Sequence, residues 1–163
     1  MPWAKMTRKR IMTVYKELFN KIVMRERDVD LTVKEVLIRT EILKRDFSKR
    51  QLSILSLIMT FSYFYGKDSA IIPKLKDFSL AGVSQTKITG ELTKLVDMGV
   101  ITWNRGKDTN EFAINDPTEW RTPYHSTYDD IRSRELFFLN LRHAGIPFDI
   151  DALMQKVMAD DDV

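Results

Sequence analysis

Residues 48–115 constrain the fold most, because turn-forming residues divide this stretch into segments of different hydrophobic periodicity. Ser48 is a suitable N-cap for a helix, and the residues that follow it are apolar almost all round until Gly66 interrupts the run. A helix without a polar face is typical of the buried centre of a domain. We therefore expect a buried helix over residues 49–65.

A second helix is expected over residues 84–98. A short extended segment at residues 69–72, a brief helix from residue 73 to 78 and a turn at residues 80–83 separate it from the first. Ser84 suits the N-cap and Gly99 suits the residue after the C-terminus. The pattern predicts two helices joined by a compact connection.

The residues after Gly99 predict a β-hairpin. β-forming residues occupy positions 100–103, a polar segment with one glycine covers 104–110, and residues 111–115 alternate with period two. Two helices followed by such a hairpin are typical of a winged helix-turn-helix, which places its second helix in the major groove of DNA. The expected fold is mainly α with a small β-hairpin wing.

The helix expected over residues 84–98 has two distinct sides when its residues are wound at about 100° each. The side expected to face the core carries Ile88, Leu92, Leu95 and Val96. The opposite side carries Thr86, Thr89, Gly90, Thr93, Lys94 and Asp97, with Lys87 at its flank.

The first turn of this helix suits base recognition. Gln85 can bind adenine, Thr86 can form a hydrogen bond or touch a thymine methyl group, and Lys87 can reach guanine. Gly90 lowers helix propensity by roughly 1 kcal/mol relative to alanine, which suggests close approach of a backbone or a phosphate. The alternative is an ordinary solvent-facing side or a protein contact.

The hairpin tip offers a second candidate contact with DNA. Arg105 and Lys107 are well placed to meet phosphates beside the groove, whereas Asp108 and Glu111 would repel them. The expected DNA-binding set is Gln85, Thr86, Lys87, Thr89, Gly90, Thr93, Lys94, Arg105 and Lys107.

Helical extensions are expected on both sides of the winged helix. Apolar residues spaced by three and four predict a helix over residues 7–27, capped by Thr7, which either mediates dimerisation or lies against the core. Capping-box spacing at Thr32 predicts a second helix to about Lys44, with a strand as the alternative.

The C-terminal part predicts helices over residues 129–143 and 151–158, followed by an acidic tail. The expected division of the chain is an N-terminal extension at residues 1–47, the winged helix at 48–115 and a C-terminal extension at 116–163.

Composition excludes several classes of site. The chain has no cysteine, and His125 and His143 are its only histidines, so neither a metal site nor a cofactor site is expected. No catalytic motif is present, so we do not expect an enzyme. No apolar run approaches the ~20 residues that cross a bilayer, which favours a cytoplasmic protein of a bacterial cell, associated with the nucleoid when bound to DNA.

Three motifs carry a family resemblance: FSKRQL at residues 47–52, SYFYGK at 62–67, and GVS at 82–84 with Leu92, Leu95 and GVI at 99–101. With these motifs the segment resembles the N-terminal winged-helix domain of phage replication proteins of the lambda O type, also called replisome organisers. The resemblance implies binding to repeated sites in a replication origin, and a separate C-terminal region that recruits the helicase or its loader.

We therefore expect a sequence-specific, double-stranded DNA-binding protein of phage-type replication initiation. One alternative is a winged-helix transcriptional repressor that acts as a homodimer. Another is an adaptor whose winged helix binds a replication protein instead of DNA.

Overall fold

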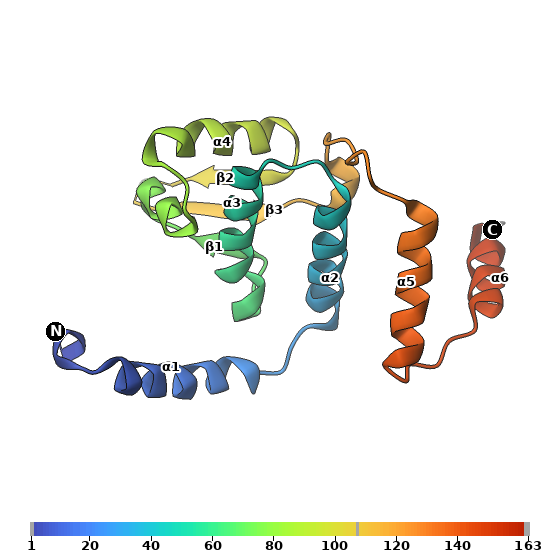
Figure 1. Ribbon diagram of the computed structural model, residues 1–163, viewed down its shortest axis with the longest axis horizontal. Helices are drawn as coiled ribbons and strands as arrows, with labels where there is room; N and C mark the ends of the chain where they lie inside the picture. Colours follow the sequence, from blue (N-terminus) through green and yellow to red (C-terminus); the bar gives the residue numbers. More distant parts are fainter. Residues whose placement is uncertain (1, 107, 162–163) are drawn as a thin grey trace. The chain divides into compact units, whose positions relative to one another are not determined.

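The computed structural model describes residues 2–106 and 108–161 (Figure 1). The elements, with η for a 3₁₀ helix, are η1 (Pro2–Lys5), α1 (Arg8–Val23), α2 (Val29–Lys44), α3 (Lys49–Thr60), η2 (Tyr63–Tyr65), β1 (Ser69–Ile71), η3 (Leu75–Ala81), α4 (Gln85–Asp97), β2 (Ile101–Arg105), β3 (Asn110–Ile114), η4 (Pro117–Glu119), α5 (Asp130–His143) and α6 (Ile150–Asp161). They form two compact units, Met1–His125 and Ser126–Val163. No helix among the described residues has the length and apolar composition that crossing a membrane requires.

A small antiparallel sheet completes the first unit. Within the described residues its strand order is β1–β3–β2, so the predicted hairpin of β2 and β3 is confirmed. The predicted extended segment becomes β1, which pairs with β3 and places Ala70 opposite Phe112. The order of these elements is that of a winged helix: α3, β1, η3, α4 and the hairpin of β2 and β3. This order confirms the expected fold class.

The core of this unit lies between α3, α4, η3 and the sheet (Figure 1). Phe78 of η3 and Phe112 of β3 are fully buried, and their rings meet edge to face at 5.1 Å. Other fully buried side chains are Ile54, Leu55, Ile58, Ile88, Leu92 and Leu95. Burying a side chain of this size contributes about 1.5–3 kcal/mol, so this cluster holds α4 against α3.

The start of α3 is fixed by a capping box. Ser48 Oγ accepts a hydrogen bond from Gln51 N at 3.2 Å, and Gln51 Oε1 accepts one from Ser48 N at 2.9 Å. The predicted cap is therefore confirmed. The helix ends at Thr60 instead of Tyr65, and the 3₁₀ turn of η2 carries the chain to Gly66, whose φ is +76°.

The helix α3 is not buried all round, which corrects the expectation from its composition. Ile54 and Ile58 are fully buried, but Leu52 is 41% exposed, and the C-cap residue Phe61 is 37% exposed. The reason is that η3, α4 and the sheet cover one side of the helix, while its other side meets solvent.

The helix α2 begins earlier than the spacing at Thr32 suggests. Asp28 is its N-cap and accepts hydrogen bonds from the backbone N–H groups of Asp30 and Leu31. Thr32 lies inside the helix, where its hydroxyl donates to Asp28 O at 3.1 Å. The strand alternative for this segment is wrong.

The helix α1 follows the predicted Thr7 cap but contains no buried residue. Its C-terminal part contacts η2, where the rings of Phe19 and Phe64 meet edge to face at 5.8 Å. Just after the helix, Arg25 Nη1 donates to Tyr65 O at 3.2 Å. Met12, Tyr15 and Leu18 remain more than two-fifths exposed. The helix therefore lies at the edge of the unit, outside its core.

The connection between β1 and α4 also differs in detail from the prediction. The brief helix starts at Leu75 instead of Pro73 and continues to Ala81. Gly82 then adopts a φ of +85°, which reverses the chain before α4. The predicted turn is thus shorter, because Leu80 and Ala81 belong to η3.

The second unit consists of α5 and α6, which confirms both predicted C-terminal helices. Asp129 caps α5 by accepting a hydrogen bond from Arg132 N at 3.1 Å. The acidic residues Asp160 and Asp161 belong to α6. Residues 116–125, by contrast, belong to the first unit, where Trp120 is buried and its indole N–H donates to Asn115 O. The division expected at residues 47 and 115 stays a prediction.

Candidate nucleic-acid interface

Burial fixes the orientation of α4. Ile88, Leu92 and Leu95 are at most 2% exposed and face the core, as predicted. Ser84 has the extended backbone of an N-cap, although its Oγ lies 3.2 Å from Thr86 Oγ1 instead of accepting from a backbone N–H. The hydroxyl groups of Ser84 and Thr86 therefore lie together at the start of α4.

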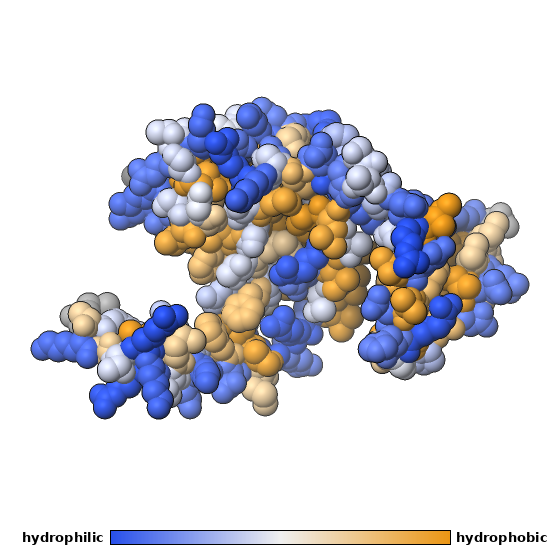
Figure 2. Space-filling model, in the orientation of Figure 1, coloured by the Kyte–Doolittle hydropathy of each residue, from blue (hydrophilic) through white to orange (hydrophobic). Residues whose placement is uncertain are grey.

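The outward side of α4 brings together most of the predicted DNA-binding residues. The predicted residues on this helix are all exposed: Gln85, Thr86, Lys87, Thr89, Gly90, Thr93 and Lys94. Figure 2 shows that the surface over α4 is mostly hydrophilic. Within the first unit this side is therefore open to a ligand.

Two residues in the middle of this side have distinct surroundings. The hydroxyl of Thr93 donates to Thr89 O at 2.8 Å, so its oxygen can still accept a hydrogen bond from a ligand. A Cβ added at Gly90 would meet no atom within 4 Å among the described residues, apart from its own stretch of helix backbone. The close approach suggested by this glycine therefore does not come from the first unit's own backbone.

At the two edges of the outward side of α4, the structure corrects the expectation from helical periodicity. Val96, expected in the core, is 37% exposed, because it lies at the edge of the buried stripe. Glu91 is only 6% exposed, although its charge suggests a position in solvent. Sequence periodicity alone did not identify this buried carboxylate.

Glu91 contacts cations from two helices. Its Oε1 lies 3.8 Å from Arg50 Nη1 of α3 and 3.8 Å from Lys94 Nζ of α4. A buried carboxylate is costly unless cations lie close to it, so these contacts offset its desolvation. The spacing of Glu91 and Lys94 is the only sequence signal for this cluster, since Arg50 is far away along the chain.

The wing presents Arg105 from the strand β2 and not from the hairpin tip. Arg105 pairs with Asn110 at the end of the hairpin, and its guanidinium lies 3.7 Å from the ring centroid of Trp103. The indole N–H of Trp103 donates to Asn110 Oδ1 at 2.9 Å. The stacked ring restricts the orientation of this cation. The other predicted wing residue, Lys107, lies outside the described residues.

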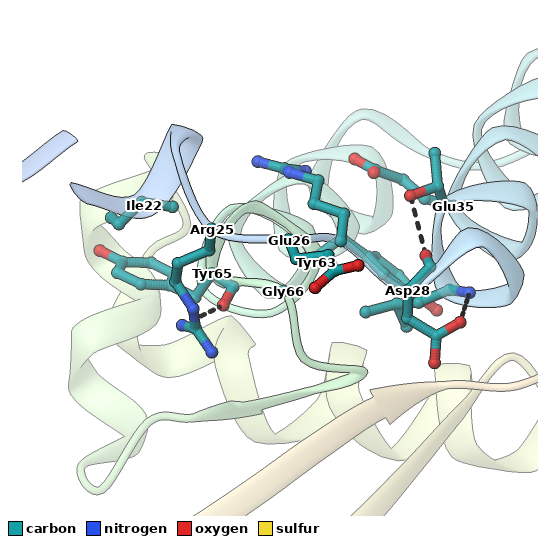
Figure 3. Close-up of a pocket in the computed structure, with 11 residues that line it drawn as sticks. Ile22, Arg25, Glu26, Asp28, Glu35, Tyr63, Tyr65 and Gly66 are labelled. Carbon is teal, nitrogen blue, oxygen red and sulfur yellow. Dashed lines mark hydrogen bonds between the residues drawn. The ribbon is translucent and has the colours of Figure 1, made fainter. Parts of the chain in front are cut away.

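A polar cavity lies away from α4, between α1, α2 and η2, and is lined by Arg25, Asp28, Glu35 and Tyr63 among others (Figure 3). Its volume of about 30 Å³ is that of roughly one water molecule. Burial raises the pKa of Tyr63 to about 12, with smaller contributions from Asp68 and Glu35. The phenol therefore stays neutral near pH 7.

Comparison with known proteins identifies a family for the segment that contains α3, the sheet and α4. A family model described as bacteriophage replication protein O matches residues 31–120, which is more than half of the chain. The matched segment runs from α2 through the hairpin to η4. No curated protein and no solved structure matches the chain. The chain belongs to the bacteriophage replication protein O family.

Proposed function

We propose that this protein binds double-stranded DNA in a sequence-specific manner at a phage replication origin and thereby initiates replication. The observation that carries the proposal is the exposed polar side of α4, on a winged-helix-like unit of a phage replication family. The protein acts as a binding protein and not as an enzyme. The lack of a recognised catalytic motif in the sequence supports this part of the proposal.

The chemistry of α4 supports a division of labour along the helix. Gln85 and Thr86, in the first turn, have side chains that can read base edges in the major groove. Lys87 and Lys94 add positive charge on one edge, and Arg105 adds a second cation on the wing. Phosphate contacts of this kind position the protein, whereas the first turn supplies sequence preference.

Substitutions on α4 and the wing test this proposal. Gln85→Ala and Thr86→Ala should each reduce discrimination at one base position by about 1–3 kcal/mol. Arg105→Ala should weaken binding to every sequence alike, because a phosphate contact carries no base information. Mobility-shift titrations with the phage's own origin and with random duplexes measure both effects.

Lys67→Ala is a matched control, since Lys67 is an exposed lysine that follows η2 and belongs neither to α4 nor to the hairpin. It should leave affinity and base preference unchanged. Equal affinity of the unaltered protein for origin and random DNA would contradict the proposal. A footprint over a promoter instead of an origin would point to transcriptional repression.

The family also supports a partner of the replication machinery, and we propose a replicative helicase or its loader. Co-purification of the protein with the helicase or loader encoded by its phage or host tests this part. Origin binding without any such association would limit the role to recognition of DNA.

A further inference from the structure

A hollow lies where α3 begins, next to the segment that leads into α4. It has a volume of about 450 Å³ and is lined by Lys49, Arg50 and Ser53 of α3 and by residues 81–83 of the connection to α4. None of the predicted DNA-binding residues lies in this hollow. Its wall on the α3 side combines an ammonium, a guanidinium and a hydroxyl group.

The three side chains of α3 are arranged to act on one ligand. Lys49 and Ser53 are separated by four residues and therefore lie on the same side of the helix, with Arg50 next to them. The side chain of Arg50 is 53% exposed, and Lys49 is also exposed. Both cations can therefore meet a ligand without any rearrangement of the core.

Glu91 places Arg50 at the edge of the proposed DNA-binding side. The same carboxylate oxygen lies within 3.8 Å of Arg50 and of Lys94, so the two cations are neighbours although they belong to different helices. This distance is too long for a hydrogen bond, so the N–H groups of the guanidinium remain available to a further acceptor.

We propose that Lys49, Arg50 and Ser53 form a binding site for a backbone phosphate of the DNA duplex, on the strand beside the groove that α4 enters. The inference rests on the proposed function and extends it to α3, which was expected only as a buried helix. Gly82 and Val83, which line the hollow on its other side, lead directly into Ser84 and the first turn of α4. The hollow therefore lies next to the end of α4 that enters the groove in helix-turn-helix docking.

Chemistry favours a phosphate over a base at this site. A guanidinium and an ammonium together offer several donors and two positive charges, which match the oxygens of a phosphodiester. The other lining residues, Ala81, Gly82 and Val83, have no polar side chain, so apart from Ser53 the hollow offers no side-chain acceptor for the amino group of adenine or cytosine. Contacts here should add affinity without sequence preference.

The test is the salt dependence of duplex binding by the full chain. Lys49→Gln and Arg50→Gln should each weaken binding to origin and random duplexes by the same factor. Each should also reduce the slope of log affinity against log salt by about 1, because one phosphate contact is lost. Fluorescence anisotropy over a salt series measures both quantities.

Lys67→Gln is the matched control, because Lys67 is an exposed lysine beyond the other end of α3. It should change neither affinity nor slope. Lys49 makes no contact with Glu91 in the structure, so Lys49→Gln keeps the test valid even if Arg50→Gln destabilises the fold.

Two results would overturn the inference in distinguishable ways. Unchanged salt slopes in both variants, with normal DNA binding by the unaltered protein, would reject the α3 site alone. Absence of DNA binding by the unaltered protein would reject the proposed function and this site together.

Discussion

Single residues decide how α4 connects to the wing. Gly99 has a φ of +73°, and a Cβ at this position would lie 2.5 Å from Glu119 O. The backbone conformation and the close approach of a carbonyl group both require glycine. Gly99 therefore sets the direction in which the hairpin leaves α4.

Gly99→Ala should destabilise the first unit more than Gly66→Ala does. Gly66 has a similar φ of +76° but open space around its Cβ position, so alanine there costs about 1–2 kcal/mol of backbone strain. Gly99→Ala adds the collision with Glu119 O, which we expect to cost a further ~1–3 kcal/mol. Urea denaturation measures both free energies of unfolding, and equal losses would contradict the packing described for Gly99.

At the scale of elements, α4 combines a tightly packed inner side with an outer side that is poor for helix stability. Leu92 and Leu95 are fully buried, whereas Gly90 in the middle of the helix is exposed. A Cβ added at Gly90 would meet no described atom within 4 Å outside its own stretch of helix backbone. Packing against α3 and the sheet therefore compensates for the low helix propensity of Gly90.

Gly90→Ala should separate stability from function. Alanine should raise the free energy of unfolding by about 1 kcal/mol, because the position is helical, exposed and free of steric conflict. The same methyl group should weaken DNA binding if a phosphate or base edge lies against Gly90. Thermal unfolding and mobility-shift titration measure the two effects.

Thr40→Ala is a suitable control for this experiment, since Thr40 is an exposed helical residue of α2. This change raises the helix propensity of α2 instead of α4, so it should leave DNA affinity unchanged. Tighter DNA binding by Gly90→Ala would show that glycine is not needed for close approach.

At the scale of the whole molecule, the core belongs entirely to the first unit among the described residues. The last buried residue along the chain is Thr122, and α5 and α6 contain none. Helices of this length are marginal in water without packing of an apolar side. The stability of the first unit should therefore not depend on residues beyond His125.

A chain that ends at His125 should keep the free energy of unfolding of the first unit within about 0.5 kcal/mol, as for changes remote from a core. His125 is a suitable end because its backbone N–H donates to Lys44 O at 3.1 Å and its side chain contacts Leu43 O. Urea denaturation followed by tryptophan fluorescence measures this quantity. Loss of cooperative unfolding would mean that residues 126–163 contribute to the fold.

Local signals in the sequence predicted most of the elements. The caps at Thr7 and Ser48 and the glycine stop after α4 act over a few residues, so they can be recognised without knowledge of the fold. The spacing of Ile88, Leu92 and Leu95 likewise indicated which side of α4 is buried. The outward residues of α4 follow directly from that spacing.

Tertiary structure alone decided the contacts between distant parts of the chain. The pairing of Ala70 with Phe112, the burial of Glu91 and the position of Arg50 beside Lys94 depend on how α3, α4 and the sheet meet. Periodicity fixes the direction of a side chain relative to its own helix or strand, but not which other element lies opposite. The sequence therefore determined the helices, the hairpin and the inner side of α4. Packing determined which residues of other elements lie at the edges of that side.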